Sequence, residues 1–192
     1  MGKHTHPKRT IYLDMDGVLV NFTLSAMKLY VDNQAVIAHM METWPNGKRV
    51  HDIVGVHKDM FWRKVNEKGV MFWSSMIQYP WCSQLVTLAQ RFARVVILSS
   101  PARGGESAMG KIQWIEKNLN ELSREFILTP KKHKCRLAKP GDVLIDDTAE
   151  TCSSWTNHGG DAILFPRPWN NHPDWCNPMQ AVIRQLGALG MV

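Results

Sequence analysis

Residues 10–20 read TIYLDMDGVLV, and this stretch decides the fold. Its first five residues form a short apolar run that ends at Asp14 and lacks the polar–apolar alternation of a half-exposed strand. Near-continuous apolarity over four or five residues is typical of a strand that is buried on both faces of a sheet. We therefore predict a buried strand at 10–14, with Asp14 and Asp16 at its carboxyl end.

Four further runs have the same character: VVILS at 95–99, FILT at 126–129, VLID at 143–146 and AILF at 162–165. Segments of helical length and period lie among them, at 81–93, 106–119 and 179–189. Strands that alternate with helices form βαβ units with right-handed crossovers. The sequence thus predicts an α/β fold with a mostly parallel sheet flanked by helices on both sides.

The interval 21–78 interrupts this alternation, because it contains no convincing buried strand. It is rich in methionine and aromatic residues and has a turn sequence at Pro45-Asn46-Gly47. A structureless loop of this length is improbable in a compact domain. We predict several short helices here, forming a small cap over the carboxyl end of the sheet. Residues 1–20 and 79–192 then form the core, and 21–78 form the cap.

Composition and charge narrow the classes of protein. The chain has 192 residues and a formal net charge of +6, which favours acidic partners such as nucleic acid, anionic lipid or phosphorylated small molecules. We expect no membrane span, because no run of about 18 apolar residues occurs. The N-terminal MGKHTHPKRT has no apolar region of the kind found in signal peptides. We therefore expect a cytoplasmic protein, with its four scattered cysteines as reduced thiols.

Polar side chains follow the ends of the predicted strands, where ligands bind in open α/β sheets. In chain order they are an acid pair, two hydroxyls, a group of cations and a second acid pair: Asp14 and Asp16, Ser99 and Ser100, the cluster 131–136, Asp146 and Asp147. Crowded carboxylates repel one another, and a divalent cation such as Mg²⁺ removes that repulsion. Hydroxyls and cations nearby are explained if a phosphate binds as well. The pattern predicts a site for phosphoryl transfer.

These residues resemble the four ordered motifs of the haloacid dehalogenase-like (HAD) hydrolase superfamily. Within it, DMDGVLVNF at 14–22, VLIDDTAE at 143–150 and the helical insertion after the first motif resemble the 5′(3′)-deoxyribonucleotidases, phage and bacterial relatives included. The stretch from Trp155 through Gly159-Gly160 to AILF also resembles the last core unit of that family. The resemblance implies a Rossmann-like HAD core with a small helical cap inserted after the first strand.

The resemblance also implies roles for the acids. Asp14 would be the nucleophile that forms an aspartyl-phosphate, and Asp16 would protonate the leaving group and later deprotonate the attacking water. Mg²⁺ would be held by Asp14, by the main-chain carbonyl of Asp16 and by one or both of Asp146 and Asp147. Gly17 would let the chain turn sharply so that Asp16 points back into the site.

Phosphate contacts would come from the second motif. Ser99, with main-chain N–H groups near Ser100, would hydrogen-bond the phosphoryl oxygens. A helix-capping turn is an equal alternative for the two serines. Arg103 lies where some deoxyribonucleotidases carry a basic residue, and it is either a phosphate ligand or an exposed loop cation.

The lysine of the third motif is left open. Lys132 and Lys134 both fit, and Lys111, on the predicted helix at 106–119, is the third choice. The apolar face of that helix is predicted to contain Ile112, Ile115 and Leu119. One lysine of the cluster would be functional and the others would lie on a solvated face.

Substrate recognition is assigned to the cap. Phe22, eight residues after Asp14, lies where the deoxyribonucleotidases place an aromatic ring against the base. Four more aromatic residues either line the rest of the base-binding site or belong to the core of the cap: Trp44, Phe61, Trp62 and Trp73. The segment 166–175, PRPWNNHPDW, either lines the entrance or is a packed surface loop.

We therefore predict a Mg²⁺-dependent phosphomonoester hydrolase, a 5′(3′)-deoxyribonucleotidase acting on (deoxy)nucleoside monophosphates. One alternative is a HAD phosphatase that acts on nucleic-acid ends or on another small phosphorylated metabolite. The other is a phosphate-binding module without turnover. We expect a small nucleotide as partner, no membrane and no nucleic acid, since a helical lid closes over small substrates. A homodimer is left open.

Overall fold

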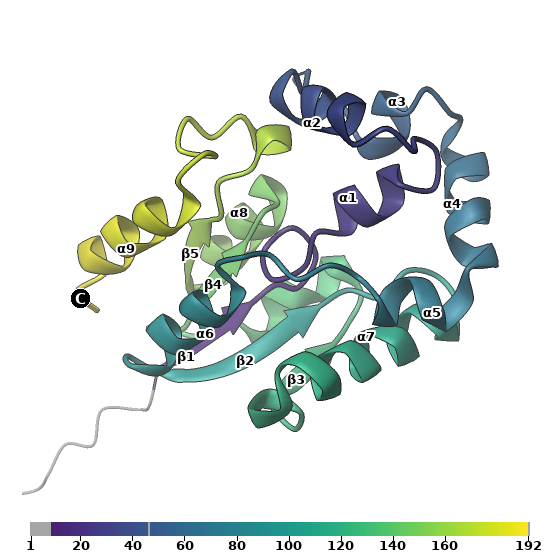
Figure 1. The fold of residues 1–192 in the computed structure, drawn as a ribbon. Helices are drawn as coiled ribbons and strands as arrows, with labels where there is room; N and C mark the ends of the chain where they lie inside the picture. The colour runs from purple at the N-terminus through teal and green to yellow at the C-terminus, as the bar shows by residue number, and fades with distance from the viewer. Residues whose placement is uncertain (1–8, 46, 192) are drawn as a thin grey trace, which may run out of the picture.

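The computed structural model describes residues 9–45 and 47–191. The predicted turn at Asn46 and most of the basic N-terminal segment lie outside these residues. Figure 1 shows a sheet of five parallel strands in the order β3-β2-β1-β4-β5. The strands are β1 (Thr10–Leu13), β2 (Arg94–Ser99), β3 (Phe126–Leu128), β4 (Val143–Asp146) and β5 (Asp161–Leu164). All five predicted strands are confirmed to within one residue at each end.

The strand order reverses next to β1. The chain runs outward from β1 through β2 to β3, and then crosses to β4 and β5 on the other side. β1 therefore pairs with both β2 and β4, and Leu13 lies beside Ile97 and Ile145. At such a reversal the loops leaving the two adjacent strands diverge and open a crevice at the carboxyl edge of the sheet. Asp14 follows β1 and Asp146 ends β4, so both acids border that crevice.

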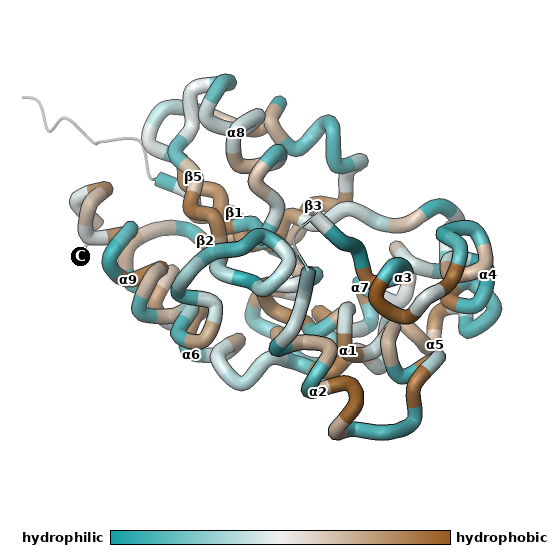
Figure 2. Tube along the Cα trace, turned by 90° about the horizontal axis from the view of Figure 1, so that it is seen from above, coloured by the Kyte–Doolittle hydropathy of each residue, from teal (hydrophilic) through white to brown (hydrophobic). Residues whose placement is uncertain are grey.

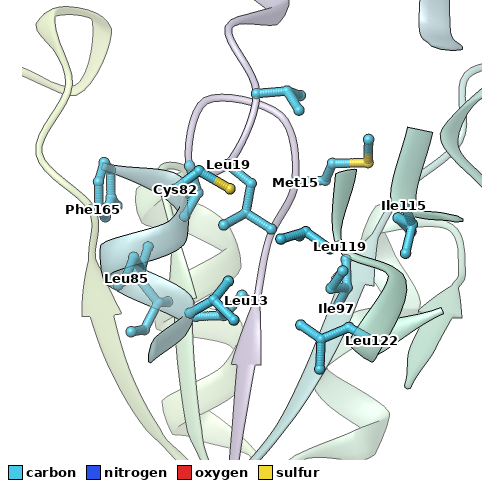
Figure 3. Packing of buried hydrophobic residues seen from close by; sticks show 14 of the residues in the cluster. Leu13, Met15, Leu19, Cys82, Leu85, Ile97, Ile115, Leu119, Leu122 and Phe165 are labelled. Atoms are coloured by element: carbon cyan, nitrogen blue, oxygen red, sulfur yellow. The ribbon is translucent and has the colours of Figure 1, made fainter. Parts of the chain in front are cut away.

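Helices cover both faces of the sheet. Alternate strand residues point to opposite faces, so Ile11 and Leu13 lie in one core cluster and Tyr12 in another. The first cluster packs under α6 (Cys82–Gln90), α7 (Gly105–Asn118) and α9 (Pro178–Ala188). Figure 3 shows part of this cluster, and Figure 2 shows hydrophobic colouring along the strands. The predicted helices at 81–93, 106–119 and 179–189 are confirmed.

The second face is covered by α8 (Ala149–Asn157), which the sequence analysis did not predict. Its sequence, AETCSSWTN, buries only Thr151, Cys152 and Trp155. Trp155 carries most of the contact, with its ring centroid 5.0 Å from that of Tyr12. Because a single large residue does this packing, no apolar period was visible.

The described part of the interval after β1, residues 21–45 and 47–78, folds into five short helices. They are α1 (Phe22–Met27), α2 (Gln34–Glu42), α3 (Val50–Ile53), α4 (Lys58–Glu67) and α5 (Gly69–Ser74). In Figure 1, α1 to α4 stand beyond one edge of the sheet, and α5 lies against α7. At Gly110 of α7 an added Cβ would lie 2.6 Å from the Val70 carbonyl oxygen, so this contact needs a glycine. The expected short helices are confirmed, and the division into cap and core at 20/21 and 78/79 stays a prediction.

Within the described residues, no helix combines the length and hydropathy that a membrane span needs. The four cysteines, all of which lie in the described part of the chain, are free thiols.

Candidate active site

Three carboxylates meet at the carboxyl ends of β1 and β4. Asp14, Asp146 and Asp147 each offer an oxygen, and these oxygens lie within 4.8 Å of one another. Asp14 and Asp146 are buried, with 8% and 1% of their surface exposed. The Asp14 N–H donates to the Ile145 carbonyl at 2.9 Å, which ties the end of one strand to its neighbour. The first and fourth motifs are therefore adjacent in space, although Asp146 follows Asp14 by 132 positions in the sequence.

Asp16 reaches the same place because the chain turns immediately after β1. The Met15 carbonyl accepts hydrogen bonds from the N–H groups of Leu19 and Val20, both at 2.9 Å. Gly17 takes a φ of 81°, in the left-handed region that favours glycine. A Cβ at this position would collide with the Asp147 carboxylate. Gly17 thus gives the turn its shape and leaves room for the second acid pair.

Lys134 joins two of the acids. Its Nζ lies 2.8 Å from Asp14 Oδ1 and 2.8 Å from Asp146 Oδ2, and the residue is 2% exposed. Burial alone would lower the pKa of Lys134, but the charges of Asp14 and Asp146 outweigh it and raise that pKa above its ordinary value. Because the ammonium neutralises part of the acid charge, Lys134 fits the third-motif lysine.

Lys132 lies in the same 3-10 helix, Lys131–Leu137, but it is exposed. A 3-10 helix has about three residues per turn, so positions 131 and 134 share one side and 132 does not. Lys131 accordingly donates to Thr148 Oγ1, next to the acids, at 3.3 Å. Of the two lysines that the sequence left open, the structure brings only Lys134 to the carboxylates.

A second lysine, Lys111 of α7, also enters the site. Its Nζ lies 2.5 Å from Asp16 Oδ2, 2.8 Å from Ser99 Oγ and 3.1 Å from the Ser100 carbonyl oxygen. The side chain is completely buried. Lys111 was the third choice for the motif lysine. Of the apolar face expected on this helix, Ile115 and Leu119 are buried and Ile112 is only partly buried. The buried stripe of α7 holds Ser107, Gly110, Lys111, Trp114 and Ile115. The position of a lysine within this stripe was the sequence signal that could have indicated a buried, functional lysine.

The electrostatics of the site favour a divalent cation. If all four carboxylates are ionised, the two ammonium groups leave an excess of two negative charges in the cluster. Burial raises the pKa of Asp16, and the charge of Lys111 offsets part of this rise. Burial also raises the pKa of Asp146. Burial, with the charges of Asp146 and Asp14, raises the pKa of Asp147 to about 7. Oxygen ligands and an excess of two negative charges fit Mg²⁺, which would remove this repulsion.

The second-motif residues differ in where they lie. Ser99 is fully buried and its Oγ accepts the hydrogen bond from Lys111. Among the described residues, Ser100 Oγ and Asp16 Oδ1 are buried without a hydrogen-bond partner. Two unsatisfied polar atoms at one place indicate room for a polar ligand. Arg103 is exposed in the loop before α7, and the structure does not bring it to the carboxylates.

Phe22 belongs to an aromatic cluster of the cap. Its ring stacks on Trp62 and on Trp73, with centroids 5.9 and 5.6 Å apart. The Trp73 ring lies 5.4 Å from Lys111 Nζ, so this cluster borders the group of acids and lysines. Trp44 and Phe61 are buried in the cap. Phe22 and Trp73 are therefore next to the site, and the other aromatics are core of the cap at least in part.

The loop after β5 supplies contacts that the sequence did not reveal. Trp169 Nε1 donates to Asp147 Oδ2 at 2.7 Å, and Asn170 Nδ2 donates to the Asp147 carbonyl at 2.8 Å. From the sequence, this loop was expected either to line the entrance of the site or to be a packed surface loop. No periodicity or motif in PRPWNNHPDW indicates which polar atoms it meets, so these two contacts could not be predicted.

Comparison with known proteins agrees with this geometry. The model of the family described as 5′ nucleotidase, deoxy (Pyrimidine), cytosolic type C protein matches residues 8–182. No curated protein matches the sequence significantly.

Solved structures share the fold at low identity. A haloacid dehalogenase-like hydrolase from Xanthomonas campestris superposes with a TM-score of 0.56 at 14% identity, over 98% of this chain and 97% of that one. A hydrolase from Streptococcus pneumoniae gives 0.55 at 12% identity, over 96% and 100%. The HAD-hydrolase YfnB from Bacillus subtilis, a structure bound to magnesium, gives 0.51 at 12%, over 82% and 86%.

Proposed function

Since the chain belongs to the family of cytosolic type C 5′ nucleotidases, and is thus a phosphatase or nucleotidase with a HAD fold, we propose that it is a Mg²⁺-dependent 5′(3′)-deoxyribonucleotidase. It hydrolyses (deoxy)nucleoside monophosphates through an aspartyl-phosphate on Asp14. The observation that carries this proposal is the cluster of Asp14, Asp146 and Asp147, in which the buried Lys134 pairs with Asp14 and Asp146, beside a second buried lysine, Lys111, that pairs with Asp16.

Asp14 is the nucleophile. One of its carboxylate oxygens attacks phosphorus, and the bond between phosphorus and the ester oxygen of the nucleoside breaks. Lys134, at 2.8 Å, fixes the direction of the Asp14 carboxylate and stabilises its charge. Mg²⁺ bound by Asp14, Asp146 and Asp147 would supply the positive charge that lets a carboxylate approach a phosphate dianion.

Asp16 is the acid and base. It gives a proton to the leaving nucleoside oxygen, and then takes a proton from the water that attacks phosphorus of the aspartyl-phosphate, releasing inorganic phosphate. The raised pKa of Asp16 suits the first of these steps, because a proton is held to higher pH than on an ordinary aspartate. Lys111 holds the Asp16 carboxylate in place and favours its ionised form after the proton has left.

The phosphoryl group lies between the two lysines in this scheme. Lys111 donates to Ser99 Oγ, which orients that hydroxyl. Ser100 Oγ, buried and without a partner among the described residues, donates to a phosphoryl oxygen. The lysine ammonium groups and the serine hydroxyls thus stabilise the negative charge that develops on the phosphoryl oxygens during transfer.

The nucleoside lies against the cap. The aromatic cluster of Phe22 and Trp73 borders the site, and planar bases stack on aromatic side chains with a favourable free energy. The description of the matching family contains the words deoxy and pyrimidine, so deoxypyrimidine monophosphates are the first substrates to test.

A phosphate-release assay over a panel of nucleoside monophosphates tests the proposal. We expect turnover with Mg²⁺, its loss with EDTA, and its loss in Asp14→Asn, which keeps the shape but removes the nucleophile. Asp32→Asn, the same change at an exposed aspartate of the cap, is the matched control and should keep the fold and the turnover. Undiminished turnover in Asp14→Asn would refute the covalent step. Faster turnover of a phosphorylated oligonucleotide than of any mononucleotide would favour the nucleic-acid alternative.

A further inference from the structure

Trp169 lies in the loop that follows β5, and its indole N–H donates to Asp147 Oδ2 at 2.7 Å. We propose that Trp169 is a positioning residue, which holds the Asp147 carboxylate in the orientation needed to bind the metal ion. The proposal rests on the proposed function, because Mg²⁺ at Asp147 is part of that function. It assigns a role to a loop that lies outside all four motifs.

The same loop also holds the backbone of Asp147. Asn170 Nδ2 donates to the carbonyl oxygens of Asp147 and Phe165, both at 2.8 Å. Asn170 Oδ1 in turn accepts from the Arg167 N–H at 3.0 Å. One short segment therefore binds the carboxylate and the peptide group of the same acid. This double attachment fixes the loop relative to the end of β4.

The indole ring itself is held by its neighbours. The Arg167 guanidinium carbon lies 4.6 Å from the ring, and a Cβ on Gly17 would lie 3.1 Å from the indole Cζ2. The Trp44 ring of the cap lies 5.6 Å away, centroid to centroid. A tryptophan packed on several sides has few rotamers open to it, so its N–H is already directed at Asp147 before any metal binds.

Asp147 needs such a donor more than the other acids do. Lys134 bonds Asp14 and Asp146, whereas the described residues offer the Asp147 side chain only neutral donors, Trp169 and the Thr148 hydroxyl. Neutral donors fix the carboxylate without cancelling its charge. Groups that hydrogen-bond a metal ligand in this way typically contribute 10–100-fold to metal affinity or activity.

The test is calorimetric titration of the nucleotide-free protein with Mg²⁺. Trp169→Phe keeps most of the ring and removes the N–H, so we expect its Mg²⁺ affinity to fall about tenfold. Trp114→Phe is the matched control. Trp114 is also buried and its indole donates to the Met76 carbonyl at 2.8 Å, so it loses an equivalent hydrogen bond away from the acids. Its Mg²⁺ affinity should stay unchanged.

A double-mutant cycle separates positioning from general destabilisation. If Trp169 acts through Asp147, Trp169→Phe should have no further effect on Mg²⁺ affinity in an Asp147→Asn background. Equal affinities in wild type and Trp169→Phe, equal losses in Trp169→Phe and Trp114→Phe, or additive losses in the cycle would each overturn the proposal. If Trp169→Phe does not fold, Trp169→Leu, which also has no side-chain donor, must show the same loss. A wild-type protein that binds no Mg²⁺ would overturn the proposed metal dependence and this inference with it.

Discussion

Replacement of Lys134 by methionine is the sharpest test of how the acid cluster is held together. The substitution keeps most of the length of the side chain and removes an ammonium that lies 2.8 Å from both Asp14 and Asp146. Those two carboxylates would then face each other with no cation between them. Removing one partner of a buried ion pair typically costs about 3–5 kcal/mol, because the other partner stays buried and unpaired.

The expected loss is measurable as a melting temperature. For a chain of this size, 1 kcal/mol corresponds to a shift of roughly 2–4 °C, so Lys134→Met should melt about 6–20 °C lower than wild type when no metal is present. Mg²⁺ should recover part of this difference, because it supplies charge to the same carboxylates. Phosphatase activity should be lost even below the melting temperature, since the nucleophile has no lysine to orient it.

Lys132→Met is the control from the same 3-10 helix. Lys132 is exposed, and surface substitutions usually change stability by no more than about 0.5 kcal/mol. Calorimetry and phosphate release on both variants, with and without Mg²⁺, therefore separate the two lysines. The reasoning is refuted if Lys134→Met melts within about 1–2 °C of Lys132→Met in the absence of metal, a difference that corresponds to roughly 0.5 kcal/mol.

Three further outcomes are expected. Asp16→Asn should lower turnover by about 10²–10⁴-fold while Mg²⁺ still binds, since the variant loses the acid and keeps the main-chain carbonyl; an unchanged rate would contradict the role of Asp16. Protonation of the leaving group requires the protonated form of Asp16, whose pKa is raised by burial. Turnover should therefore fall as the pH rises above that pKa. The residual turnover of Asp16→Asn should not show this fall. Gly110→Ala should destabilise the protein by about 1–3 kcal/mol, because its Cβ would press on the Val70 carbonyl where α5 meets α7, and Gly187→Ala, which meets no atom within 4 Å, is the control for denaturation by urea.

Sequence and structure agree most closely where a residue type has one physical explanation. Each of the five strands was predicted from a run of apolar residues, which is typical of strands in a parallel sheet covered by helices. The central strands β1, β2 and β4 are mostly buried, whereas the edge strands β3 and β5 are only partly buried. The acids at 14, 16, 146 and 147 could be grouped because parallel strands end at one edge of the sheet. In contrast, α8 was missed, since one tryptophan among small polar residues buries the helix without producing a period.

The lysines show why the side chains of a site are harder to predict than its strands. Lys132 and Lys134 differ by two positions, and the helix type decides which of them is buried. Lys111, on the helix that precedes the third motif, is only the third choice from the sequence, yet its ammonium is satisfied by Asp16, Ser99 and a carbonyl. Such partners come from loops distant in the sequence, which local patterns do not encode.

The arrangement of the two lysines also bears on the alternative of a phosphate-binding module without turnover. Lys134 pairs with Asp14 and Asp146, and Lys111 pairs with Asp16, so the proposed nucleophile and the proposed acid belong to different ion pairs. A module that only binds phosphate needs no second acid that is held apart from the first. Environments that separate two neighbouring carboxyl groups are typical of sites where one attacks and the other transfers a proton. The separate pairing of Asp16 with Lys111 therefore favours hydrolysis over binding alone, and it does so independently of which nucleotide occupies the cap.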